Sequence, residues 1–249
     1  MSNVSQPARR VRVFSDASAV AAAAARHLEE LALSSVRKQG RFTLALSGGS
    51  TPRALYQLLS EHPELPWSQM ELCFGDERAV PPEHEASNAR MVAQALTHRD
   101  FVPKARVHRI RGELPAADAA REYEQTLRGL FPGATLPRFD LILLGLGSDG
   151  HTASLFPESP ALVEQEAWVV AQRVDGLDAE RITLTFPVLN AAAQVLFLVS
   201  GADKADALHE VIAGNAPVSR IPARGVLPQQ GIVTFFVDEA AVASHVNRL

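Results

Sequence analysis

The chain has 249 residues, of which 47% are hydrophobic and 21% charged, and its formal net charge is −4. A chain of this length buries roughly three-quarters of the surface that it exposes when unfolded, so it needs no metal or disulfide for stability. The single cysteine, Cys73, excludes an intrachain disulfide, the scattered basic residues argue against a nucleic-acid-binding face, and no run of about 18 apolar residues suggests a membrane span.

Short apolar runs that alternate with longer helical stretches predict the strands. In chain order they cover residues 42–46, 71–74, 140–144, 168–170, 182–185, 195–199 and 232–237. Continuous apolar runs are typical of parallel strands buried on both faces, and their alternation with helices is typical of βαβ units. The sequence therefore predicts an α/β fold around a mostly parallel sheet.

Capping residues and prolines predict the helices. Asp16 can cap a helix that runs through the alanine-rich segment to about Lys38, where Gly40 supplies the positive φ of a helix end. Because proline suits a first helical turn, further helices are expected to begin near Pro52, Ser87, Pro115, Pro187 and Ala202, and a last one follows Asp238. The proline-rich stretch 217–228 is predicted to be a surface loop.

No repeat or linker composition divides the chain, so we expect one domain over residues 1–249. The N-terminal stretch carries Arg9, Arg10 and Arg12 without the apolar segment of a secretory signal. The expected compartment is therefore the cytoplasm.

A strand, a glycine turn and a helix follow one another around residues 44–53. The turn consists of Ser47, Gly48, Gly49, Ser50 and Thr51. Two glycines let the backbone approach a ligand, while unpaired N–H groups and the positive end of the helix dipole favour an anion such as phosphate. The alternative is a tight turn in which Ser50 or Thr51 only caps the helix. The segment lacks the Gly-Lys-Ser/Thr ending of a Walker A loop.

Three consecutive charged residues, Asp76, Glu77 and Arg78, follow the next apolar strand. Ligands bind at the carboxyl ends of strands in open α/β sheets, which is where these residues are expected to lie. Arg78 could hold a phosphate through a bidentate fork, while Asp76 or Glu77 could orient a sugar hydroxyl or another side chain. The alternative is a solvated loop.

A third segment, residues 145–151, reads Gly-Leu-Gly-Ser-Asp-Gly-His. It matches the G-x-G-x-x-G pattern of dinucleotide sites, but Pro157 and Pro160 interrupt the helix that such a site requires. His151 is suited to act as a general base because part of an imidazole population is neutral near neutral pH, and Asp149 could fix its tautomer. The alternative is an ordinary surface or core histidine. The chain shows no metal-ligand spacing of histidines or cysteines, so no metal is expected.

Two isolated cations complete the candidates. Arg181 precedes the run 182–185, and Lys204 follows the run 195–199. Either could add positive charge to an anion site if the fold brings it to the same sheet edge. Taken singly, each is more typical of a solvated cation.

Five segments carry a resemblance to a known family: residues 47–52, 74–78, 145–157, 181–185 and 200–204. From about residue 13 to Ala241 the chain resembles the 6-phosphogluconolactonases of the glucosamine-6-phosphate isomerase superfamily. The resemblance implies a Rossmann-like α/β fold, with a mostly parallel sheet and helices on both faces. It also implies hydrolysis of 6-phosphogluconolactone in the oxidative pentose phosphate pathway, without a cofactor.

The same resemblance implies roles for individual residues. It makes His151 the catalytic base, and Asp76 and Asp149 match acidic positions kept across the superfamily. The residues expected to bind the substrate's phosphate are Gly48, Gly49, Ser50, Thr51, Arg78, Arg181 and Lys204. The expected partner is a small sugar-phosphate lactone, with no nucleic acid or membrane, and the protein is expected to be a monomer or a small homo-oligomer.

Three other functions are open. Related glucosamine-6-phosphate deaminases resemble the chain in the Asp-Gly-His segment but continue to Asn-Glu-Pro, and Phe156 stands here in the place of that glutamate. A nicotinamide-dependent dehydrogenase rests on the glycine match alone. A non-catalytic sugar-phosphate sensor would need a further module, for which a single domain has no room. Because Phe156 replaces the glutamate of the deaminases, the sequence favours the lactonase over the deaminase.

Overall fold

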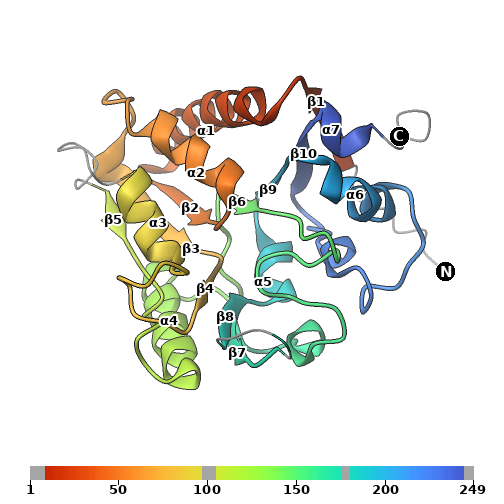
Figure 1. Cartoon of the computed structure of the whole chain (residues 1–249). Helices are drawn as coiled ribbons and strands as arrows, with labels where there is room; N and C mark the ends of the chain where they lie inside the picture. The colour runs from red at the N-terminus through yellow and green to blue at the C-terminus, as the bar shows by residue number, and fades with distance from the viewer. Residues whose placement is uncertain (1–8, 97–104, 175, 177–179, 244–249) are drawn as a thin grey trace.

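The computed structural model describes residues 9–96, 105–174, 176 and 180–243; the first eight residues of the N-terminal stretch considered above lie outside this part. Seven parallel strands form the main sheet, in the order β1-β10-β9-β6-β2-β3-β5 (Figure 1). Their bounds are β1 Arg9–Phe14, β2 Phe42–Leu46, β3 Met70–Phe74, β5 Arg106–Val107, β6 Leu141–Leu144, β9 Gln194–Val199 and β10 Ile232–Asp238. Every residue of β2, β3 and β6 is buried, which is why these strands are apolar at all positions but Thr43 and Glu71.

The helices begin close to their predicted positions. They are α1 Ala17–Gln39, α2 Ser50–Leu59, α3 Asn88–Ala95, α4 Ala116–Leu130, α5 Phe186–Ala191, α6 Ala205–Ile212 and α7 Glu239–Val242. The predicted ends of α1 are confirmed, because Ala19 N donates to Asp16 Oδ1 at 2.8 Å and Gly40 has a φ of 78°. In the described part of the chain, none of these helices is long and apolar enough to cross a bilayer.

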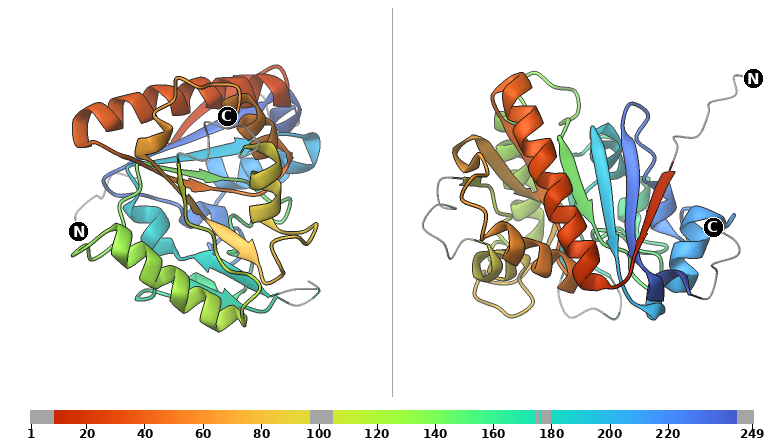
Figure 2. Two further views of the ribbon diagram at one scale, coloured as in Figure 1. Left: turned by 90° about the vertical axis from the view of Figure 1, so that its left-hand side faces the viewer. Right: turned by 90° about the horizontal axis from the view of Figure 1, so that it is seen from above.

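A second, antiparallel sheet of three strands lies beside the main one, in the order β4-β8-β7. Its strands are β4 Asp76–Arg78, β7 Val169–Gln172 and β8 Arg181–Leu184. Gly75 joins the two sheets, because its N–H donates to Leu46 O at 2.8 Å and its carbonyl accepts from Leu184 N at 2.9 Å. Figure 2 shows α1 on one face of the main sheet, with α4 and the small sheet on the other. The expected α/β fold with helices on both faces is confirmed.

Three strands and one loop differ from the sequence-based expectation. Strands β1, β4 and β5 were not predicted: β1 alternates arginine with apolar residues at a sheet edge, β4 is charged, and β5 has two residues. The runs 168–170 and 182–185 are strands but belong to the small sheet. The stretch 217–228 is only partly a surface loop, since Ala223 and Val226 are buried and Ala223 N donates to Gly150 O at 2.9 Å.

Candidate active site

A cleft of about 280 Å³ lies where the carboxyl ends of β2, β6 and β9 meet the small sheet and the start of α3. Open α/β sheets bind ligands in this position. Its walls contain the predicted residues Gly48, Gly49, Ser50, Thr51, Asp76, Arg78, His151 and Lys204. Residues from four separate segments of the sequence therefore line one cleft. Asp149 and Arg181 do not line it.

The glycine turn after β2 forms one wall of the cleft. Gly49 is the N-cap residue of α2 and has a φ of 113°, a backbone conformation that residues other than glycine rarely adopt. A Cβ atom on Gly48 would lie 2.2 Å from Asn88 Oδ1, so only glycine fits there. No side chain caps the first turn of α2, which rules out the alternative that Ser50 or Thr51 serves as the cap. The start of α2 thus faces the cleft with no capping side chain and no acidic residue in its own first turn.

Two buried hydroxyls in the cleft lack a protein partner. Within the described part of the chain, Ser47 Oγ and Ser200 Oγ are inaccessible to solvent and form no hydrogen bond, although both residues line the cleft. Buried polar atoms in proteins are nearly always paired, so an unpaired one needs an explanation. Because both residues border the cleft, a small rotation of either side chain would let its hydroxyl donate to an oxygen of a ligand bound there.

A hydrogen-bond network around Asn88 holds Arg78 and Asp76 next to the glycine turn. Arg78 Nη1 donates to Ala86 O at 2.7 Å and to Asn88 Oδ1 at 2.9 Å. Asn88 Nδ2 in turn donates to Asp76 O at 3.0 Å, and Ser154 Oγ donates to Asp76 Oδ2 at 2.7 Å. Asn88 and Ser154 were missed in the sequence because nothing in it connects the start of α3 or the segment after His151 with the 76–78 strand.

Glu77 points away from the cleft because successive side chains of a strand alternate between faces. It is 2% exposed, and its carboxylate accepts hydrogen bonds from the N–H groups of Arg78, Asn88 and Ala89, each at 2.8 Å. Burial raises the pKa of Glu77, and the three N–H donors act in the opposite direction. Its role is therefore to fix the start of α3, which carries Asn88, rather than to orient a ligand.

His151 lies on the loop that follows β6, with a carboxylate on one side and an aromatic ring on the other. Its Nδ1 is 2.5 Å from Asp149 Oδ1, and its ring stacks on Phe156 with centroids 4.4 Å apart. Partial burial raises the pKa of Asp149, but the hydrogen bonds from His151 outweigh burial and leave that pKa below its ordinary value. An ionised carboxylate only accepts hydrogen bonds, so Nδ1 carries the proton and the neutral ring offers Nε2 as a base.

The loop's backbone supports this arrangement. Gly147 N donates to His151 O at 2.9 Å, and Gly150 adopts a φ of 83°. No α-helix follows the loop directly, because the next element after β6 is a short 3-10 helix, η3 Pro160–Val163. The structure therefore agrees with setting aside the dinucleotide interpretation of the glycines.

The two remaining cations differ in position. Lys204 lines the cleft and forms an ion pair with Asp203, with Nζ 2.9 Å from Oδ2. Arg181 lies on β8 opposite Arg78 in the antiparallel ladder, outside the cleft wall. The structure thus brings Lys204, but not Arg181, to the cleft.

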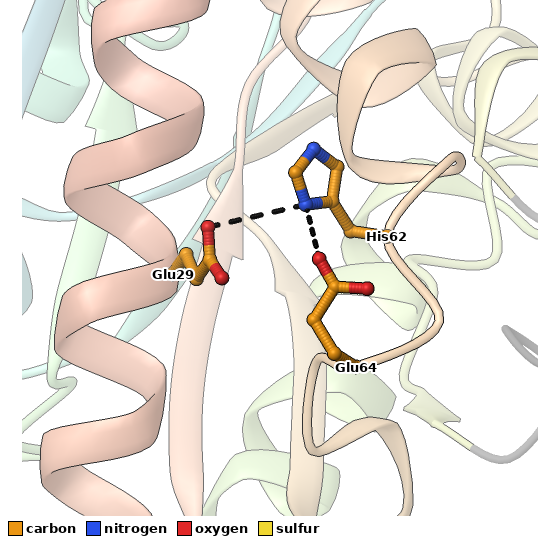
Figure 3. A group of neighbouring side chains, drawn as sticks. All are labelled: Glu29, His62 and Glu64. Atoms are coloured by element: carbon orange, nitrogen blue, oxygen red, sulfur yellow. Dashed lines mark hydrogen bonds and ion pairs between the residues drawn. The ribbon is translucent and has the colours of Figure 1, made fainter.

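One group of side chains in the described part of the chain could hold a metal ion: Glu29, His62 and Glu64 (Figure 3). His62 Nδ1 lies 2.6 Å from Glu64 Oε1 and 3.9 Å from Glu29 Oε2, so the imidazole already has two carboxylate partners. His62 follows the end of α2, whereas the cleft lies at its start. The group links α1 to the segment after α2 and has no contact with the cleft.

The fold and the cleft define an α/β protein in which a glycine turn, two cationic side chains and an imidazole lie together at the carboxyl ends of the strands. The family model for glucosamine-6-phosphate isomerases/6-phosphogluconolactonase matches residues 15–235. The chain therefore belongs to this family, and the predicted membership is confirmed.

Relatives and solved structures agree with this assignment. A 6-phosphogluconolactonase from Nostoc sp. is 42% identical over 212 residues, covering 84% of this chain and 86% of the relative. One from Synechocystis sp. is 41% identical over 213 residues, covering 83% and 85%. The structure of 6-phosphogluconolactonase from Trypanosoma cruzi superposes with a TM-score of 0.85 at 30% identity, covering 96% of this chain and 98% of that one.

Proposed function

We propose that this protein hydrolyses 6-phospho-D-glucono-1,5-lactone to 6-phosphogluconate in the oxidative pentose phosphate pathway. One observation carries the proposal: a single cleft contains both a glycine turn suited to a phosphate and an imidazole oriented by a carboxylate. The names of the relatives in Nostoc and Synechocystis support the choice of substrate. We further propose that the enzyme consists of a single domain. It would act in the cytoplasm, where a small, soluble sugar phosphate is accessible to it.

The phosphate would bind at the glycine turn. The N–H groups of Gly48, Gly49, Ser50 and Thr51 and the positive end of α2 favour an anion there. Arg78 and Lys204 add positive charge at the cleft wall, and the unpaired hydroxyls of Ser47 and Ser200 add hydrogen-bond donors. Arg181 pairs with Arg78 but does not line the cleft, so its positive charge would attract the phosphate without direct contact. Binding at this remote group would hold the lactone carbonyl close to His151.

The reaction proposed for His151 is general-base hydrolysis. Nε2 takes a proton from water while the water oxygen attacks C1 of the lactone. As the ester bond between C1 and the ring oxygen breaks, the imidazolium returns the proton to that oxygen, so the products are the free acid and a regenerated neutral imidazole. Asp149 holds the ring in the required tautomer and stabilises its charged form. Proton transfer of this kind contributes about 10²- to 10⁴-fold to the rate.

Phe156 separates this proposal from the deaminase alternative. The deaminases carry a glutamate at this place in the segment, where it serves ring opening, whereas this chain carries an aromatic ring stacked on His151. A phenyl ring cannot exchange a proton, so the cleft lacks that group for amino-sugar chemistry. The aromatic ring instead supports the imidazole.

The decisive experiment generates the lactone with glucose-6-phosphate dehydrogenase and follows its disappearance with and without the protein. We expect hydrolysis well above the spontaneous rate and no release of ammonia from glucosamine 6-phosphate. A rate equal to the spontaneous one would contradict the proposal, and ammonia release would replace it with the deaminase.

Gly147→Ala is expected to lower kcat at least tenfold with little loss of stability. A Cβ at this position would lie 2.1 Å from His151 Nδ1 and 2.4 Å from Asp149 Oδ1, so the new methyl group must displace the imidazole from its carboxylate. These atoms belong to side chains that can rotate, which keeps the fold intact. The control is Gly129→Ala in α4, where a methyl group meets nothing within 4 Å. Equal kcat values for the two variants would show that the His151–Asp149 contact is dispensable.

A further inference from the structure

The two tyrosines of the sequence have equivalent environments at the ends of neighbouring strands. Tyr56 and Tyr123 are 0% and 2% exposed. The hydroxyl of Tyr56 accepts from Ser47 N and donates to Ser47 O, both at 2.9 Å. The hydroxyl of Tyr123 accepts from Phe74 N at 2.6 Å and donates to Phe74 O at 3.0 Å. Each phenol thus satisfies both backbone groups of one residue at the carboxyl end of a strand.

The residue that Tyr56 holds is the first residue of the glycine turn. The pairing of β2 with β3 ends at Leu46 and Phe74, so Ser47 lies beyond the ladder. Tyr56 lies on α2, the helix that begins at the other end of the same turn. The turn is therefore fixed at both ends by α2: covalently at Ser50, and through the phenol at Ser47.

The far side of the turn is also fixed, because Gly48 packs against Asn88. Burial raises the pKa of Tyr56 well above its ordinary value, so the hydroxyl keeps the proton that it donates to Ser47 O. Ser47 borders the cleft from this fixed backbone. The turn therefore has a defined shape in the absence of ligand.

We propose that Tyr56 is a positioning residue for the anion-binding turn, holding Ser47 so that the N–H groups after it converge on the phosphate before the phosphate arrives. The proposal rests on the proposed function, because it assigns the substrate's phosphate to this turn. Preorganisation of this kind raises affinity by removing the cost of ordering a loop on binding. It acts on binding rather than on the proton transfer at His151.

Tyr56→Phe tests the proposal by removing one hydroxyl group. We expect KM for the lactone to rise about tenfold, the effect of one to two net hydrogen bonds, with kcat changed less than threefold. Titration with inorganic phosphate, followed by calorimetry, should show a similar loss of affinity without any need for turnover. An unchanged KM and an unchanged phosphate affinity in a folded Tyr56→Phe protein would overturn the proposal.

Tyr123→Phe is the matched control, since it removes the same atom from a similarly buried phenol of α4, which holds the end of the adjacent strand β3 instead of the turn. Both variants should lower the melting temperature by a similar amount, but only Tyr56→Phe should lower the affinity for inorganic phosphate. Equal weakening by both variants would show general loosening of the sheet and would also overturn the proposal. If the wild-type protein binds phosphate but does not hydrolyse the lactone, the proposed function fails while the positioning role is still measured by phosphate affinity.

Hydrogen exchange of the wild-type protein provides a test that needs no variant. The amide of Ser47 should be protected without ligand, to a degree similar to that of Phe74, because a buried phenol accepts each N–H. Rapid exchange at Ser47 with slow exchange at Phe74 would show that the turn is not held in advance, and the proposal would be wrong.

Discussion

Replacing His151 with alanine is expected to lower kcat for the lactone by about 10²- to 10⁴-fold, the usual contribution of a general base. His151 lines the cleft, and among the residues that the structure describes its ring forms a hydrogen bond through Nδ1, to Asp149, and none through Nε2. The variant therefore loses the group that would accept the proton of the attacking water. KM should change little, because the phosphate is proposed to bind at the glycine turn.

The measurement is a kinetic profile on enzymatically generated lactone, together with a thermal unfolding curve. His62→Ala is the matched control: it also removes a partly exposed histidine paired with a carboxylate, but at the far end of α2 from the cleft. We expect that variant to retain wild-type kcat. A folded His151→Ala protein with near-normal turnover would remove His151 from the mechanism.

Arg78→Ala is expected to raise KM by about 10- to 100-fold, since a hydrogen bond to a charged group contributes about 1.5–3 kcal/mol. Arg78 lines the cleft, and Ala86 O and Asn88 Oδ1 fix its Nη1, which leaves its other nitrogens for a phosphate oxygen. The loss should fall on KM more than on kcat, because the phosphate is remote from the reacting carbonyl.

Arg90→Ala serves as the control for the structural part of this effect. Arg90 Nη1 also donates to a backbone carbonyl of the segment before α3, that of Glu83, at 2.9 Å, but Arg90 does not line the cleft. Its replacement should leave KM unchanged. Arg78→Lys should recover part of the affinity, because it keeps the charge and loses the fork. An unchanged KM in Arg78→Ala would reject the phosphate contact.

The strands of the main sheet and the starts of the helices follow from local patterns. Phe42–Leu46 is apolar at every position but Thr43 because both faces are covered, and Asp16 and Gly40 mark the ends of α1 by the backbone geometry that they favour. The edge strands β1 and β5 escaped prediction because their pairing partners, rather than their own composition, make them strands. For β1 that partner is β10, which lies more than 200 residues later in the sequence and leaves no trace in the local periodicity.

The candidate site was predicted as separate motifs, and the structure shows how they meet. Gly48, Arg78, His151 and Lys204 were each chosen for their chemistry and placed at strand ends, which parallel topology brings to one edge. Asn88 escaped notice because its contacts with Arg78 and Asp76 depend on the return of the chain after β4. Arg181 was grouped with the cations, and its pairing with Arg78 in the ladder of β4 and β8 places it beside that residue on the same face of the small sheet, although Arg181 itself does not line the cleft.

The position of β1 has a consequence for synthesis of the protein. Among the strands in the described part of the chain, β1 Arg9–Phe14 pairs with β10 Ile232–Asp238 alone, and because β10 lies more than 200 residues later in the sequence, β1 leaves the ribosome well before its partner. Until then β9 has a bare edge, and unpaired edges of apolar strands invite association with other chains. A nascent chain truncated before β10 would therefore expose the edge of β9 and leave β1 without a partner, and such fragments should aggregate or be degraded.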